Sequence, residues 1–240
     1  MAAWIVAALI AAGAVYLWNR WRQLARVEFI RNYTFPHGLF AKLNEKRPQL
    51  DTKQMQLVAR ALRQFFLAYL RGGRQYVSMP SQVTDDLWHE FILYTRHYDA
   101  FCRRAFGSFL HHTPAVVLSR ERQNNSGLRR VWWYSCKEEN INPRKPTRLP
   151  LLFALDSKLG IADGFVYRPD CKKVRASGDS TVDAGIVYCG GDFFDTSFDG
   201  SIDGFGSGDS SFGDAISGSD VSSGCGGDSG CGGGCGGGGD

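Results

Sequence analysis

A run of seventeen uncharged residues, Ala2 to Trp18, opens the chain. As an α-helix the run would be about 26 Å long, close to the bilayer hydrocarbon core of about 30 Å. Trp4 and Trp18 would lie at the two membrane interfaces, where tryptophan is enriched. The run therefore predicts a single transmembrane anchor over residues 1–19.

Two alternatives to this anchor remain. A cleavable signal peptide fits the small residues Ala11-Ala12-Gly13-Ala14, but its positively charged n-region is missing. A buried core helix fits poorly with so long an uncharged run. Because Arg20, Arg22 and Arg26 follow the run and no charged side chain precedes it, the positive-inside rule predicts an outside N-terminus and a cytoplasmic body. In the cytoplasm the seven cysteines should be reduced.

Charge divides the chain into two parts. Residues 1–175 hold all 28 Lys and Arg but only 13 Asp and Glu, whereas residues 176–240 hold 11 Asp and no basic residue. This asymmetry predicts either an anionic partner for the body or an acidic tail that folds back on it. Anionic lipid headgroups suit a membrane-tethered chain.

Residues 20–175 are predicted to form a compact all-α domain. Apolar residues recur at helical spacing after Asp51, which has the position of an N-cap, until Gly72-Gly73. Residues 83–106 form a second helical region, capped by Thr84 or Asp85. Shorter helices are expected at 19–31, 38–46, 128–139 and 151–160, and a short strand or turn at 164–171.

The remaining residues, 176–240, are predicted to be a disordered, acidic, Gly/Ser/Cys-rich tail. Residues 190–240 contain 19 Gly and 9 Asp among 51 residues, so little apolar surface is available to offset the loss of chain entropy on folding. Cys225, Cys231 and Cys235 are too widely spaced for a typical zinc knuckle.

A cluster of histidines is the strongest chemical signal. Four of the five histidines lie between residues 89 and 112. Because His, Cys and carboxylate groups ligate zinc and iron, this density predicts a zinc or iron site. The predicted ligands are His89, Cys102, His111 and Cys136, with Asp86, Trp88, Tyr98, His112 and Cys171 in support.

The spacing of these residues leaves an alternative open. His89 and Cys102 can share a face only if the helix breaks near Thr95. Otherwise both are core residues packed beside Trp88 and Phe101, and the spacing favours this alternative.

Known catalytic motifs do not account for the cluster. His89-Glu90 begins a zincin HExxH motif, but Leu93 replaces its second histidine. A cysteine nucleophile would have to pair Cys102 with His111 or its neighbour. The sequence contains no P-loop, nucleophile elbow or dinucleotide-binding fingerprint.

The stretch MPSQVTDDLWHEFILYTRHYDAFCRRAFGSFLHH, residues 79–112, resembles a motif of the glycine-rich domain-containing proteins, known from plants and bacteria. The resemblance extends moderately over residues 80–175 and, by composition, over the tail. It implies no particular reaction, and Phe91 replaces a second histidine that plant members often carry. The matching residues here are Asp86, Trp88, His89, Tyr98, Cys102, Gly107 and His111.

Together these features predict a membrane-tethered helical interaction module with a metal site and an unnamed protein partner. The alternative is a metal-dependent enzyme that uses the cluster over residues 86–112, with Asp86 or Glu90 as base. Nucleic acid is a less natural partner, since no recognised binding motif occurs.

Overall fold

The computed structural model describes residues 1–112, 126–169, 187–189 and Phe193. The predicted disordered tail over 176–240 therefore falls almost entirely outside the described residues, as does the predicted ligand Cys171.

Within the described residues the chain is mostly helical with almost no strand, which confirms the all-α prediction. One short parallel pair of strands joins Val166 to Val187, so the expected strand within 164–171 is also confirmed. The elements are α1 (Ala2–Arg31), α2 (Leu39–Lys46), α3 (Thr52–Arg71), α4 (Gln82–Leu93), α5 (Thr95–Ala105), α6 (Ser126–Glu138), α7 (Leu151–Leu159), β1 (Val166–Arg168) and β2 (Val187–Cys189).

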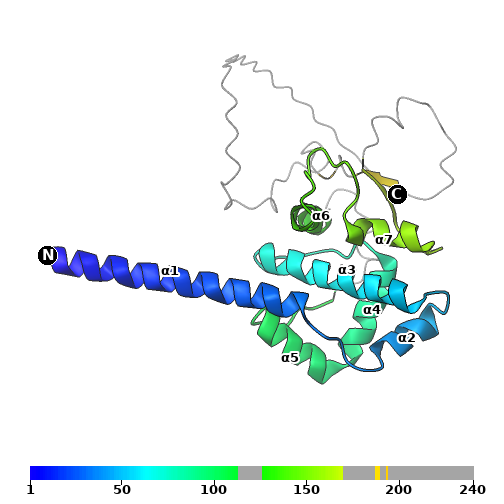
Figure 1. Ribbon diagram of the computed structural model, residues 1–240, viewed down its shortest axis with the longest axis horizontal. Helices are drawn as coiled ribbons and strands as arrows, with labels where there is room; N and C mark the ends of the chain where they lie inside the picture. The colour runs from blue at the N-terminus through cyan, green and yellow to red at the C-terminus, as the bar shows by residue number, and fades with distance from the viewer. Residues whose placement is uncertain (113–125, 170–186, 190–192, 194–240) are drawn as a thin grey trace, which may run out of the picture. The chain divides into compact units, whose positions relative to one another are not determined.

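Helix α1 continues without a break through the predicted end of the anchor at residue 19. The side chains of residues 3–25 are exposed, whereas Ile30 is fully buried against the rest of the body. Figure 1 shows the C-terminal part of α1 beside α3 and α5, which it contacts. The apolar part of α1 is long enough to cross a membrane, and an N-terminal signal sequence would meet the same criteria.

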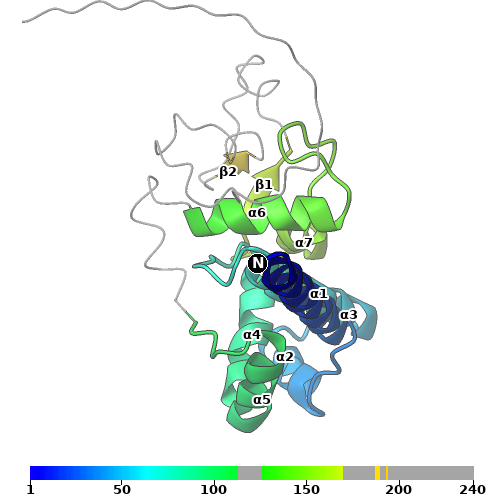
Figure 2. The same ribbon diagram turned by 90° about the vertical axis from the view of Figure 1, so that its left-hand side faces the viewer.

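Helix α3 lies at the centre of the described body. Both views place α6 and α7 on one side of α3, and α2, α4 and α5 on the other (Figures 1 and 2). Asp51 caps α3 through a capping box with Gln54, as its position predicted, and Gly72 ends the helix. Because α3 is covered on both sides, Leu62, Phe65 and Phe66 are completely buried.

The predicted helical region 83–106 is two helices. The backbone of Tyr94 leaves the helical conformation, with φ −78° and ψ 58°, so α4 ends at Leu93 and α5 begins at Thr95. The predicted N-caps Thr84 and Asp85 were wrong: Ser81 caps α4, and its Oγ accepts a hydrogen bond from the Thr84 N–H.

Ordered packing continues beyond residue 175. Phe193 is buried, with its ring 5.3 Å from the Trp132 ring on α6 and 5.8 Å from the Phe153 ring on α7. The helical body therefore includes a contribution from the first part of the region assigned to the tail.

Candidate metal centre

Helix α4 supplies two potential ligands from adjacent turns. Asp85 and His89 are four residues apart, a spacing that places both side chains on the same face. Oδ2 of Asp85 lies 3.5 Å from Nδ1 of His89. The Asp85 side chain is buried, whereas 43% of the His89 side chain is exposed, so the pair opens toward solvent on the His89 side.

His112 completes the group from a distant part of the chain. Its Nε2 nitrogen donates to Oδ1 of Asp85 at 2.9 Å, and its ring centroid lies 4.1 Å from that of His89. One ligand atom from each residue lies within 4.8 Å of the other two. A tetrahedral ion with bonds of about 2.1 Å holds its ligand atoms about 3.4 Å apart, so modest side-chain shifts would fit these three groups around one ion.

A hydrogen-bonded chain of buried residues places His112 beside α4. The Nε1 of Trp88 donates to the hydroxyl of Tyr98 at 3.2 Å, and this hydroxyl donates to the carbonyl of Leu110 at 2.6 Å. The Trp88 ring also packs edge-on against the His112 ring at 4.6 Å. Two of the predicted supporting residues, Trp88 and Tyr98, therefore hold the third potential ligand in place.

Gly107 allows the chain to turn back from α5 toward α4. Its φ of +81° is a left-handed conformation that favours glycine, and its N–H caps α5 by donating to the carbonyls of Cys102 and Arg103. A Cβ at this position would also lie 3.0 Å from Nη2 of Arg26. The turn carries residues 108–112 back over α4.

The other carboxylates of α4 are engaged elsewhere. Arg47 donates to Asp86 at 2.8 Å and to Asp163 at 2.5 Å, and Lys46 pairs with Glu90 at 2.9 Å. The hydrogen bond to Asp163, followed by that to Asp86, raises the pKa of the Arg47 guanidinium. In turn, Arg47 lowers the pKa of Asp163. Asp86 and Glu90 therefore tie α4 to the end of α2.

The two described cysteines among the predicted ligands are buried thiols. Cys102 is completely buried next to the Tyr98 side chain and the Leu110 backbone, and this burial raises the pKa of its thiol. On α6, burial raises the pKa of Cys136 to about 12. Metals bind the thiolate form, which these environments disfavour, and neither thiol joins a group of three potential ligands among the described residues.

His111 faces away from the group that its neighbour joins. Its side chain is exposed, and its ring packs against Phe109 at 4.9 Å. The helix break required for a shared His89–Cys102 face does occur, at Tyr94, yet Cys102 packs in the core. Of the predicted ligands the structure brings His89 to the group, together with the supporting residue His112.

Asp85 lies among the carboxylates next to His89 in the sequence, but it was not among the predicted ligands. The signal that could have identified it is its i, i+4 spacing to His89 within a helix, because two ligands at that spacing face the same ion. Two imidazoles and one carboxylate suit zinc or ferrous iron, and three protein ligands leave at least one coordination position for water or another molecule.

Fold and site together define an all-α domain with a two-histidine, one-carboxylate group and an apolar N-terminal helix. The UCP032817-like family model matches residues 25–193, and the chain belongs to this family. The resemblance to the glycine-rich domain-containing proteins was therefore wrong. The match begins after the apolar run and ends at Phe193, the last described residue. No curated protein and no solved structure matches the chain.

Proposed function

We propose that this chain is a membrane-tethered helical module that binds a divalent transition-metal ion, zinc or ferrous iron, through Asp85, His89 and His112. The observation that carries the proposal is the convergence of their three ligand atoms within 4.8 Å. The donor set fits these metals, because imidazole nitrogen with one carboxylate oxygen occurs in both zinc and non-haem iron sites.

The structure of the site's surroundings supports a bound ion. The Asp85 carboxylate faces two imidazoles and no Lys or Arg among its recorded contacts, whereas Asp86 and Glu90 each pair with a basic side chain. A metal ion would supply the positive charge that a buried carboxylate requires.

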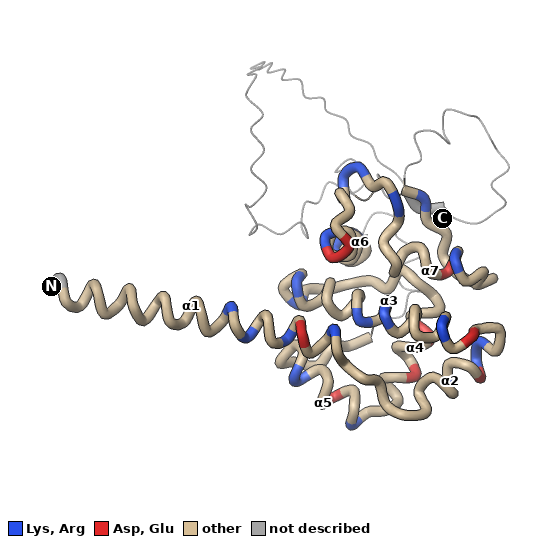
Figure 3. Tube along the Cα trace, in the orientation of Figure 1, with Lys and Arg blue, Asp and Glu red and all other residues tan. Residues whose placement is uncertain are grey.

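Helix α1 supports the membrane tether. Its exposed apolar side chains, from Trp4 to Trp18, have no packing partner in the body. Figure 3 shows basic residues beginning in the second half of α1, where Arg20, Arg22 and Arg26 follow the apolar part. Anionic headgroups would attract these side chains, at about 1 kcal/mol each, and would favour a cytoplasmic body.

A metal-dependent enzyme is the second candidate, favoured by the coordination position that three ligands leave open. In such an enzyme Asp86 and Glu90 would be poor bases, because each is held in an ion pair. Water on the metal would be the reacting group, and the exposed side of His89 gives it access to solvent.

Elemental analysis of the full-length protein, purified in detergent without chelators, tests the metal site. We expect near-stoichiometric zinc or iron in the wild type and a loss of at least ten-fold in Asp85→Asn and His112→Ala. His97→Ala is the matched control, since His97 is exposed on α5 and belongs to no ligand group. Folded wild-type protein that holds no metal after zinc or iron is supplied would rule out the proposal.

Membrane extraction tests the tether independently. The protein should stay in the membrane after an alkaline carbonate wash and keep its original N-terminus, and protease added outside intact cells should spare the body. A mature N-terminus near Ala14 would show cleavage of a signal sequence instead.

A further inference from the structure

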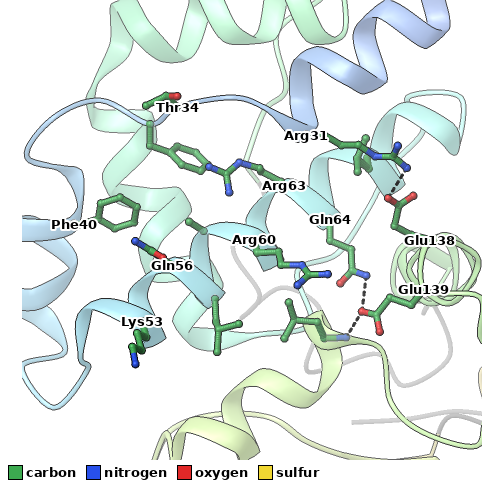
Figure 4. A pocket seen from close by; sticks show the side chains of 15 residues that line it. Arg31, Thr34, Phe40, Lys53, Gln56, Arg60, Arg63, Gln64, Glu138 and Glu139 are labelled. Carbon is green, nitrogen blue, oxygen red and sulfur yellow. Dashed lines mark hydrogen bonds and ion pairs between the residues drawn. The ribbon is translucent and has the colours of Figure 1, made fainter.

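A groove of about 770 Å³ lies between the end of α1, the start of α2, α3 and the end of α6, on residues separate from the metal-ligand group. Figure 4 shows Lys53, Gln56, Arg60 and Arg63 of α3 along it. These four residues follow a spacing of three and four, so they share one helix face. The volume lies within the range of sites that bind small molecules.

The acidic side chains at one end of the groove are already neutralised. Glu138 forms ion pairs with Arg31 at 2.7 Å and with Arg71. Glu139 pairs with Arg148 and also accepts hydrogen bonds from the Gln64 amide and the Leu151 N–H. Figure 4 shows the contact of Glu138 with Arg31 and that of Glu139 with Gln64. They leave no carboxylate there to balance the cations of α3.

Arg63 is a half-buried cation without a counter-ion among the described residues. Its Nε and Nη2 donate to the Tyr33 carbonyl at 3.0 and 2.8 Å, and its guanidinium lies over the Phe35 ring, 5.0 Å from the centroid. A carbonyl and a ring face do not cancel a full charge, and burial lowers the pKa of this guanidinium. Its Nη1 donors make no recorded hydrogen bond to a described residue.

Arg60 and Lys53 extend this uncompensated charge along α3. Both side chains line the groove, and neither forms a recorded hydrogen bond or ion pair with a described residue. One helical turn separates Arg60 from Arg63, so both guanidinium groups can reach the same anion. The groove thus presents three cations with no carboxylate partner.

Apolar side chains also line the groove, from the segment that leads into α2, from the start of α2 and from α3 itself. Phe35 and Phe40 line it together with Leu57 and Leu67 of α3. A ligand that matches this lining needs an anionic group to bind the arginine guanidinium groups, and an apolar or aromatic part to pack against the phenylalanine rings.

We propose that this groove binds a water-soluble organic phosphate that carries an apolar or aromatic group. Arg60 and Arg63 would contact the phosphoryl oxygens, and Phe35 and Phe40 would cover the apolar part. A soluble ligand is favoured over a lipid because Arg31 follows Trp18 by thirteen residues of continuous helix, about 20 Å. If α1 stands upright in the membrane with Trp18 at the edge of the hydrocarbon core, the groove lies about 20 Å from that edge. The headgroup layer is only about 5–8 Å thick, so the groove would lie beyond it.

Calorimetric titration of the full-length protein in phosphatidylcholine nanodiscs tests this proposal, with phenyl phosphate and inorganic phosphate as probes. We expect saturable binding of one phenyl phosphate per chain, at least five-fold tighter than inorganic phosphate. Arg60→Gln should weaken phenyl phosphate at least five-fold without loss of folding, because Arg60 is exposed and makes no contact that the fold requires.

Arg96→Gln is the charge-matched control, because Arg96 is exposed on α5 and does not line the groove. Equal affinity in wild type and Arg60→Gln, or an equal loss in Arg96→Gln, would overturn the proposal. Phosphatidylserine nanodiscs separate the two sources of phosphate: if their lipid displaces phenyl phosphate, the groove binds headgroups and the soluble ligand is excluded. Metal content should be unchanged in Arg60→Gln, which keeps this test independent of the metal site.

Discussion

Nε2 of His112 lies 2.9 Å from Oδ1 of Asp85, although 27 positions separate the two residues and a helix break intervenes. This contact depends on Tyr98, whose hydroxyl connects Trp88 on α4 to the Leu110 carbonyl two residues before His112. The candidate metal centre is therefore sensitive to residues that would never touch the ion.

Tyr98→Phe should weaken both the site and the fold. Removal of the hydroxyl leaves the buried Trp88 N–H and Leu110 carbonyl without this partner, at a cost of about 1–3 kcal/mol in the free energy of unfolding. Because the 107–112 segment loses an anchor, metal affinity should fall by about ten-fold. Thermal unfolding and competitive chelation of metal-loaded protein measure the two effects.

Tyr76→Phe is the control for this variant. Tyr76 is partly exposed, and its hydroxyl makes no recorded hydrogen bond among the described residues, so both quantities should stay near those of the wild type. Unchanged metal affinity in a destabilised Tyr98→Phe protein would show that the tyrosine supports only the core.

Asp156→Ala should be among the most destabilising substitutions outside the aromatic core. This buried carboxylate of α7 accepts hydrogen bonds from Ser81 Oγ at 2.8 Å, from the N–H groups of Gln82 and Val83, and from the Phe165 N–H at 3.0 Å. Its loss leaves several buried donors unpaired at the start of α4, at a cost of about 3–5 kcal/mol.

Chemical denaturation of Asp156→Ala beside Asp99→Ala measures this effect. Asp99 forms an exposed ion pair with Arg103, so its substitution should cost less than about 1 kcal/mol. Similar costs for the two variants would contradict the proposed role of Asp156 in joining α7 to α4.

Local sequence signals predicted most of the helices. Asp51 and Gly72 predicted the two ends of α3, because capping depends on residues within one turn. The short helices expected at 128–139 and 151–160 correspond to α6 and α7. The sequence raised a helix break near Thr95 only as a condition for a shared face of His89 and Cys102. It did not predict the break at Tyr94, because no glycine or proline marks that position and tertiary packing determines it.

The site was predicted less well than the fold. His89 was identified because histidines are dense nearby, but the pairing of Asp85 with His112 depends on a turn at Gly107 and on contacts made by Tyr98. Composition does not show which thiols point into the core, so Cys102 and Cys136 were named as ligands. Long-range contacts of this kind are set by packing, and no short motif records them.

The Arg47–Asp163 ion pair should make stability depend on pH. Arg47 lowers the pKa of Asp163 below its usual 3.8, so the pair stabilises the fold above that value and is lost as pH falls through the lower folded pKa. Because Asp163 is partly exposed, Asp163→Asn should cost only about 0.5–1 kcal/mol at pH 7. The difference from wild type should shrink toward zero as the pH falls below 3.8.

A double-mutant cycle with Arg47→Gln isolates this pair. In the Arg47→Gln background, Asp163→Asn should have little effect on the free energy of unfolding at any pH. A pH-dependent difference that persists without Arg47 would assign the titration to another group.

Phe193→Ala should destabilise the helical body, even though the residue lies within the region assigned to the tail from its sequence. The ring is 4% exposed and contacts the rings of Trp132, Phe153 and Tyr167. Truncation of a buried phenylalanine costs about 3–5 kcal/mol, which should lower the unfolding midpoint clearly. Phe109→Ala, at a ring that is 43% exposed, should have a much smaller effect. If Phe193→Ala has the same unfolding midpoint as the wild type, Phe193 does not stabilise the helical body. The end of the family match at residue 193 would then not correspond to the end of the stable fold.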